Sequence, residues 1–202
     1  MKLLLSTASP YARKVWVMLH EKGLADRTEL IRVAAIEDPE ALLAANPVGL
    51  VPTLVRDDGE SLYDSIVITE YLDYLGGPRF YPQAGEARWQ ALRAQALCDG
   101  MLDAAVDTVL DRRRPNAEQS PSWQARLADR IERLLAEMER QIAGLPADAD
   151  GLAQLFFPCA LDYLLFREIV PDWRPAHPRL ADWFAAAIAR ESLRATDPRL
   201  HA

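Results

Sequence analysis

The pattern of this chain changes at Gly76-Gly77-Pro78, and that change sets its predicted architecture. Before these residues, short runs typical of strands and of helices alternate; after them, every long periodic segment is helical. A chain of 202 residues with 50% hydrophobic residues can bury a sizeable core in one large domain or two small ones. We therefore predict an α/β domain over residues 1–76, a linker over 77–85 and an all-α domain over 86–202.

The predicted α/β domain begins with a strand, a helix and a second strand. After a short helix, it ends with two strands joined by a tight turn and a last helix. Asp58-Gly59 suits that turn, because these residues accept the left-handed backbone of a hairpin. This order predicts a mixed sheet covered by helices on at least one face. The predicted strands cover 2–5, 28–33, 53–55 and 61–63, and the predicted helices cover 11–22, 39–45 and 65–75.

The predicted all-α domain is a bundle of helices over 86–113, 120–144, 152–170 and 179–188. The net charge of -7 argues against a nucleic-acid partner, because proteins that bind nucleic acids are usually basic. No apolar stretch reaches the length of a membrane span, so we expect no membrane partner. Cys98 and Cys159 have neither metal-binding nor redox spacing. We therefore expect no metal, no disulfide framework and a cytoplasmic location.

Ser9-Pro10 marks the start of the first predicted helix, directly after the strand at 2–5. An N-cap serine accepts a hydrogen bond from an N–H of the first turn, and proline has no N–H to leave unpaired. A hydroxyl at this place lies beside the positive end of the helix dipole, where an anion such as a thiolate is stabilised. Taken alone, the pattern indicates a helix cap more often than a binding site.

Four motifs follow one another along the chain. They are Ser9–Val15 (SPYARKV), Asn46–Leu54 (NPVGLVPTL), Leu62–Leu72 (LYDSIVITEYL) and Asp162–Arg167 (DYLLFR). In this order the chain resembles the soluble, cytosolic-type glutathione S-transferases, in a bacterial-like form with serine at the catalytic position. The resemblance covers essentially the whole chain. It implies a thioredoxin-like first domain that binds glutathione and a helical second domain that contributes the site of the electrophile.

The resemblance also implies roles for individual residues in binding glutathione. Pro52 matches the position of a cis-proline, and Val51 before it would pair its backbone with the cysteinyl backbone of glutathione. Ser65 and the N–H groups at the start of its helix would bind the γ-glutamyl carboxylate. Asp64 would accept hydrogen bonds from the γ-glutamyl ammonium group.

The resemblance makes Ser9 the catalytic residue. Its hydroxyl would donate a hydrogen bond to the glutathione sulfur and so favour the thiolate, which is the nucleophile. Ser6 and Thr7 lie nearby and remain open as alternatives for this contact. Related families have cysteine at the Ser9 position and catalyse thiol–disulfide exchange. Neither Ser9 nor Ala12 is cysteine, so the dithiol pattern of those families is absent.

The chain departs from the family pattern at two places. Leu50 stands where many relatives have lysine or glutamine, which removes a polar contact to glutathione and leaves Arg32 as candidate for the glycyl carboxylate. Gly151 and Gln154 stand where relatives begin a helix with a capping box. Because this pair can satisfy the helix N–H groups only in part, we expect a less stable helical domain with an intact fold.

We expect the electrophile site to lie between the two domains and to be lined by Tyr11, Met101, Ala105 and Arg112. The run Arg112–Arg114 is compatible with an anionic co-substrate. Arginines at the end of a helix are also common as a solvated terminus, since positive charge suits the dipole there. The sequence does not identify the electrophile.

The predicted function is the transfer of glutathione to a small hydrophobic electrophile. Two alternatives use the same scaffold: a non-catalytic binding or regulatory protein, and a glutathione-dependent disulfide reductase that uses no protein cysteine. Retention of Ser9, Val51-Pro52 and Asp64-Ser65 together favours the transferase. The expected partners are glutathione as co-substrate, the electrophile and a second copy of the chain in a homodimer.

Overall fold

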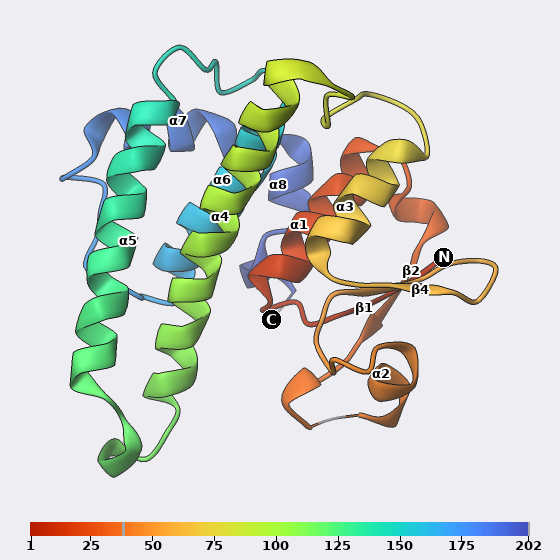
Figure 1. Ribbon diagram of the computed structural model, residues 1–202, viewed down its shortest axis with the longest axis horizontal. Coiled ribbons are helices and arrows are strands. Elements are labelled where there is room, and N and C mark those ends of the chain that lie inside the picture. Colours follow the sequence, from red (N-terminus) through yellow and green to blue (C-terminus); the bar gives the residue numbers. More distant parts are fainter. Residues whose placement is uncertain (38, 202) are drawn as a thin grey trace. The chain divides into compact units, whose positions relative to one another are not determined.

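The computed structural model describes residues 1–37 and 39–201, and the chain divides into two compact units (Figure 1). The first unit comprises Met1–Tyr81 together with Glu191–Ala202, and the second comprises Pro82–Arg190. Within the described residues, no helix is both long enough and apolar enough to cross a membrane.

A mixed sheet with the strand order β2-β1-β3-β4 forms the centre of the first unit. Strand β1 (Lys2–Leu5) runs parallel to β2 (Glu29–Arg32) and antiparallel to β3 (Thr53–Val55). Strand β4 (Ser61–Leu62) is antiparallel to β3, as expected for a hairpin. The predicted mixed sheet is confirmed, and β1 and β3 have their predicted bounds.

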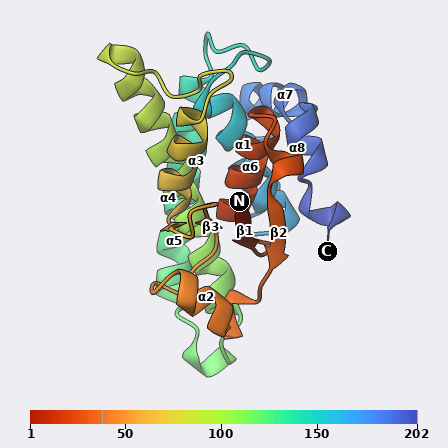
Figure 2. The same cartoon turned by 90° about the vertical axis from the view of Figure 1, so that its right-hand side faces the viewer.

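Helices cover both faces of this sheet (Figures 1 and 2). Helices α1 (Pro10–Glu21) and α3 (Ser65–Tyr74) lie on one face, and the short α2 (Glu40–Ala45) lies on the other. Single 3-10 turns span Ala25–Arg27 and Ala35–Glu37. The core between helices and sheet consists of fully buried apolar side chains, among them Leu3, Leu5, Val15, Met18, Leu54, Ile68 and Leu72.

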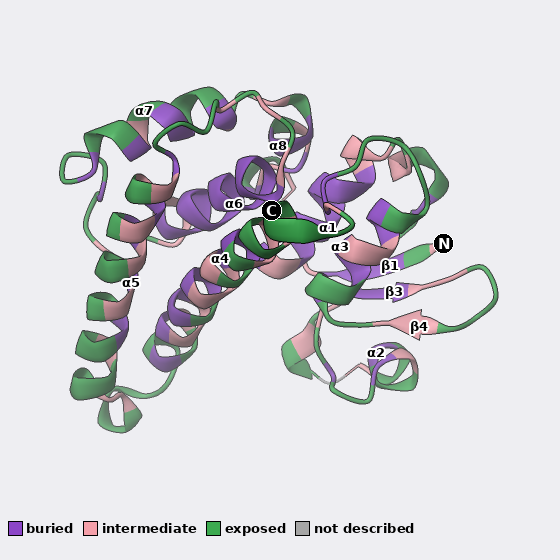
Figure 3. Ribbon diagram, turned by 45° about the horizontal axis from the view of Figure 1, so that its top comes forward, coloured by how far each residue is buried: buried purple, intermediate pink, exposed green. Residues whose placement is uncertain are grey.

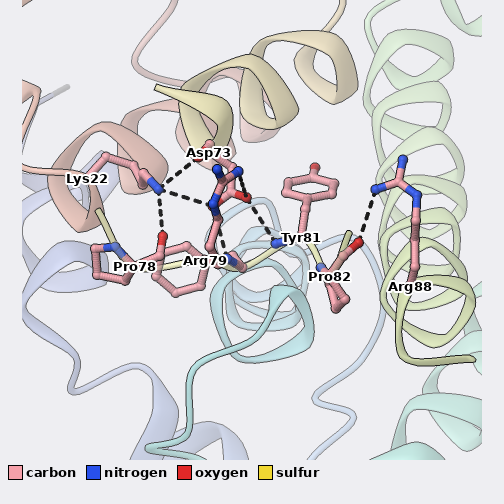
Figure 4. Close-up of polar contacts among 8 residues, drawn as sticks. Lys22, Asp73, Pro78, Arg79, Tyr81, Pro82 and Arg88 are labelled. Atoms are coloured by element: carbon pink, nitrogen blue, oxygen red, sulfur yellow. Dashed lines mark hydrogen bonds and ion pairs between the residues drawn. The ribbon is translucent and has the colours of Figure 1, made fainter. Parts of the chain in front are cut away.

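A buried ion pair holds the segment that follows α3 (Figure 4). Lys22 Nζ lies 3.2 Å from Asp73 Oδ1, and each of the two side chains is only 1% exposed. The Asp73 carboxylate also accepts from the backbone N–H groups of Phe80 and Tyr81, at 2.9 and 3.2 Å. Lys22 Nζ donates to the carbonyl of Pro78 at 2.6 Å. The beginning of the predicted linker is therefore an ordered part of the first unit.

The end of the chain packs on α1. Helix α8 (Glu191–Ala195) receives a hydrogen bond from buried Arg13, whose Nη2 donates to the Leu193 carbonyl at 3.1 Å. A 3-10 turn over Pro198–Leu200 follows. The sequence predicts this segment as part of the all-α domain, but its contacts group it with the first unit. A helix of one turn carries no local signal that specifies its packing partner.

Helices form the second unit: α4 (Gly85–Arg112), α5 (Pro121–Gln141), α6 (Leu152–Phe166) and α7 (Pro178–Ala187), with a 3-10 turn at Asn116–Glu118. Helix α4 packs against α5 and α6, and α7 packs against α5 and α6. Figure 3 shows α6 buried along nearly its whole length, whereas α5 keeps an exposed face. The predicted fold class, a thioredoxin-like α/β part followed by helices, is confirmed. The buried positions of α5 recur every three or four residues, at Leu127, Ile131, Leu135 and Met138.

Helix α6 begins without a side-chain cap, as the sequence predicts. Gly151 occupies the N-cap position, and Gln154 donates instead to the carbonyl of Pro146 at 3.1 Å. A Cβ atom at Gly151 would lie 2.6 Å from Oε1 of Gln154, so the glutamine side chain fills the place of a capping residue. The helix continues through Pro158 and ends at Phe166, four residues before the predicted end.

Candidate glutathione site

The strand directions bring the predicted glutathione-binding residues to one end of the sheet. Strand β1 is antiparallel to β3, with Leu4 opposite Thr53, so the end of β1 lies beside the start of β3. Ser9 follows that end of β1, and Val51-Pro52 precedes that start of β3. Strand β4 is also antiparallel to β3, so Asp64-Ser65, which follows β4, comes to the same end of the sheet.

Ser9 is the N-cap of α1, as predicted. Its Oγ accepts a hydrogen bond from the N–H of Ala12 at 3.3 Å, and Pro10 occupies the first turn. The Ser9 side chain is half-buried. Because the hydroxyl is an acceptor in the capping bond, its own proton remains available to a ligand atom beside the start of the helix. The helix dipole favours negative charge on that atom.

Asn46 organises the turn before β3 and is only 1% exposed. Its Nδ2 donates to the carbonyl of Leu50 at 2.9 Å and to Oγ1 of Thr53 at 3.0 Å. Its Oδ1 accepts from the N–H of Val48 at 2.9 Å. Gly49 has a φ of 72°, a conformation that favours glycine, and donates to the Asn46 carbonyl. These bonds fix the backbone that leads into β3.

The Val51–Pro52 peptide bond is cis, as the resemblance implies. Pro52 is buried and Val51 is half-buried. Among residues 1–37 and 39–201, the backbone N–H and C=O of Val51 form no hydrogen bond with the protein. Such groups can pair with an extended peptide as a neighbouring strand would. The Tyr63–Asp64 peptide bond is also cis.

Helix α3 begins directly after this second cis bond. Asp64 is its N-cap, and Oδ1 accepts from the N–H of Ile66 at 2.9 Å. Asp64 is exposed, whereas Ser65 is 3% exposed and its carbonyl accepts from Oγ1 of Thr69 at 2.8 Å. The carboxylate can accept from a cation, and the N–H groups of the first turn can donate to an anion. This terminus can therefore bind a zwitterionic group.

The other residues predicted for binding lie in different parts of the chain. Arg32 is exposed at the end of β2, which neighbours β1 in parallel orientation. Tyr11 is half-buried in α1 of the first unit, and Met101 and Ala105 are fully buried in α4 of the second unit. Arg112 donates to two backbone carbonyls within the second unit, which gives its guanidinium a structural role.

The described residues contain no group of three or more histidine, cysteine, aspartate or glutamate side chains that could hold a metal ion. Cys98 and Cys159 are buried, unbridged thiols. Their Sγ atoms donate to the carbonyls of Phe156 and Leu155, at 3.2 and 3.3 Å. These contacts assign both cysteines to the packing of the second unit.

The sequence-based interpretation missed the role of Asn46. It used Asn46 only as the residue that follows a predicted helix and as the first residue of the motif Asn46–Leu54. A signal was available, because asparagine side chains often bond to the backbone two residues further on and so stabilise turns. Asp73 was also missed, and no local pattern identifies it, because its partners Lys22 and Phe80 lie in separate segments.

Comparison with known proteins agrees with this geometry. Residues 8–75 match the family described as glutathione S-transferase, N-terminal domain. The GST-like protein YibF of Escherichia coli K12 is 33% identical over 201 residues, with 98% of both chains covered. A maleylacetoacetate isomerase of Pseudomonas aeruginosa is 30% identical over 204 residues, covering 88% of this chain and 92% of that protein.

Solved structures show the same relationship. A glutathione transferase family member from Pseudomonas fluorescens Pf-5, crystallised with bound glutathione, has a TM-score of 0.93 and 38% identity over 98% of each chain. A glutathione S-transferase from Methylobacillus flagellatus KT with glutathione bound has a TM-score of 0.86 and 36% identity, again over 98% of each chain. The similarity extends over nearly the full length of the chain. The chain belongs to the glutathione S-transferase family.

Proposed function

We propose that this chain is a glutathione transferase that stabilises the glutathione thiolate with Ser9 and transfers the sulfur to a small hydrophobic electrophile. One observation carries the proposal: the Ser9 hydroxyl, the unpaired Val51 backbone and the start of α3 meet at one end of the sheet. Related proteins from Pseudomonas fluorescens hold glutathione and S-(propanoic acid)-glutathione in their structures.

Glutathione has groups that suit each of these elements. Its cysteinyl backbone would pair with the N–H and C=O of Val51, next to Pro52. Its γ-glutamyl carboxylate would accept from Ser65 and the first N–H groups of α3, and its ammonium would donate to Asp64. Its glycyl carboxylate requires a cation, and exposed Arg32 at the end of β2 is our candidate.

The proposed reaction begins when the bound thiol loses its proton to solvent. A hydrogen bond to a charged group contributes about 1.5–3 kcal/mol, which corresponds to a decrease of about one to two units in the thiol pKa. The thiolate sulfur then forms a bond to the electrophilic carbon, and a leaving group departs with the bonding electron pair. Ser9 acts as a hydrogen-bond donor to sulfur and not as the nucleophile.

Half-buried Tyr11 of the first unit is our candidate for contact with the electrophile. We also propose a homodimer that acts in the cytoplasm. Large apolar side chains exposed on helices support an interface: Tyr74 on α3 is 72% exposed, and Trp89 on α4 is 65% exposed. Sedimentation equilibrium tests this proposal, and a monomer at micromolar concentration would contradict it.

The test of the catalytic role is an ultraviolet difference titration of bound glutathione. Wild-type protein should hold thiolate at neutral pH, whereas Ser9→Ala should bind glutathione as the thiol. Ser6→Ala and Thr7→Ala are the matched controls and should retain the thiolate. If Ser6→Ala or Thr7→Ala abolishes the thiolate instead, the catalytic hydroxyl is a different one. If the wild type binds no glutathione, the transferase proposal is wrong and a binding protein of another kind is favoured.

A further inference from the structure

The end of α4 is tied to the end of α6 within the second unit. Arg112 Nη1 donates to the carbonyl of Glu168 at 3.0 Å, and its Nη2 donates to the carbonyl of Ile169 at 2.8 Å. Arg112, the first arginine of the run Arg112–Arg114, therefore has a structural role. Arg113 follows directly in the sequence.

Arg167 and Arg113 lie near the buried side chain of Tyr163. The guanidinium of Arg167 lies 4.7 Å from the ring centre of Phe166 and 5.9 Å from that of Tyr163, which is 6% exposed. Burial raises the pKa of the Tyr163 hydroxyl, and the nearby charges of Arg167 and Arg113 oppose that rise. Both cations therefore lie close enough to Tyr163 to act on its charge.

Arg167 and Arg113 have no carboxylate partner among the described residues, although Arg167 also makes a hydrogen-bonding contact with Tyr163. The Nε atom of Arg167 is buried and has no hydrogen-bond partner. In the part of the chain that the structure describes, neither Arg167 nor Arg113 forms an ion pair, although acidic residues outnumber basic ones by 30 to 23. By contrast, Arg140 and Arg174 each form an ion pair with a nearby carboxylate. A buried donor without a partner is unfavourable unless a ligand supplies the acceptor.

We propose that Arg167, Arg113 and Tyr163 form a carboxylate-binding subsite, and that the preferred electrophiles of this protein carry a carboxylate. The inference rests on the proposed transferase function and adds the class of its second substrate. A planar guanidinium matches a carboxylate in two hydrogen bonds, and a second cation and a phenol hydroxyl complete an anion site. The apolar rings of Phe166 and Tyr163 would pack against the carbon skeleton of the same molecule.

Two probes that differ in charge and by one methyl group test the subsite: 4-chloro-3-nitrobenzoate and its methyl ester. In each, the glutathione thiolate bonds to the ring carbon that bears chlorine, and chloride leaves with the bonding electrons. Binding of each probe is first measured by calorimetry without glutathione, so that this result does not depend on catalysis. Turnover of both probes with glutathione is measured second.

We expect wild-type protein to bind the acid about tenfold or more tightly than the ester, with a preference that weakens as salt is added. Arg167→Gln and Arg113→Gln should lose about tenfold in acid affinity and leave ester affinity unchanged. Tyr163→Phe should lose less, and Arg167→Lys should retain part of the preference because it keeps the charge. Arg114→Gln is the matched control from the same arginine run and should bind like the wild type.

The outcomes separate the subsite from the transferase function. Equal binding of acid and ester by the wild type, or unchanged acid affinity in Arg167→Gln with a native circular dichroism spectrum, overturns the subsite. Turnover of the ester without any acid preference leaves the transferase function standing and also overturns the subsite. Acid preference in binding without turnover of either probe overturns the transferase function and leaves an anion-binding site at these residues.

Discussion

Replacing Asp73 tests how the segment after α3 is held. In Asp73→Asn, the carboxylate that accepts from Lys22, Phe80 and Tyr81 becomes an amide, and one acceptor atom becomes a donor. The new NH₂ group would then face an ammonium or a backbone N–H (Figure 4). Lys22, with a side chain only 1% exposed, would lose its carboxylate partner. Breaking a buried pair on one side costs about 3–5 kcal/mol, and we expect this range for the first unit.

The reverse replacement should cost less. Lys22→Met leaves Asp73 with its two backbone N–H donors and with Arg79 Nη1 at 3.8 Å. Combining Lys22→Met with Asp73→Asn removes both charges, so the double variant should be more stable than the sum of the single effects predicts. A coupling of about 1–3 kcal/mol is typical of residues in direct contact.

Native-state hydrogen exchange measures both the global and the local effect. Core amides of β1 report the stability of the first unit, and the N–H groups of Phe80 and Tyr81 report the segment itself. Glu137→Gln, which breaks a partly exposed ion pair of the second unit, is the control and should leave these amides unchanged. If Asp73→Asn costs less than about 1 kcal/mol and both amides stay protected, the reasoning from burial is wrong.

Three further predictions concern other parts of the chain. Asn46→Ala removes three side-chain hydrogen bonds, so the free energy of unfolding measured in urea should fall by about 3 kcal/mol. Glutathione binding should also weaken. The control Asn116→Ala, at an exposed position, should change neither quantity. The single variant Gly151→Ser would place its Cβ against the side chain of Gln154. The double variant Gly151→Ser with Gln154→Asp restores a helix cap, so its stability in thermal unfolding should rise by about 1 kcal/mol. A double variant less stable than the wild type would contradict this. Hydrogen bonds from Arg140 and Gln141 lower the pKa of Glu137 from 4.5 to about 2. The contribution of Glu137 to stability is therefore present above about pH 4.5 and is lost as the pH falls towards 2. It amounts to less than about 1 kcal/mol because the side chain is partly exposed. The variant Glu137→Gln should remove this pH dependence of stability.

Much of the candidate site could be predicted because its signals are local. The cap at Ser9 depends on residues within one helical turn and forms as predicted, and the cap at Asp64 is equally local. The cis bond before Pro52 was implied by the family resemblance, which rests on several motifs along the chain. The alternation of strands and helices before residue 76 was sufficient to predict a mixed sheet, because few topologies join such elements with short connections.

The roles that required the structure depend on residues far apart in the sequence. The sequence by itself determined the elements, their caps and their division into an α/β part and a helical part, since these follow from short-range hydrogen bonding and periodicity. Only the tertiary structure decided that α8 packs on α1, that Arg112 binds the residues after α6, and that the Nε atom of Arg167 has no hydrogen-bond partner. Whether a charged side chain finds a partner depends on the path of the whole chain, and no pattern within one helix specifies that path.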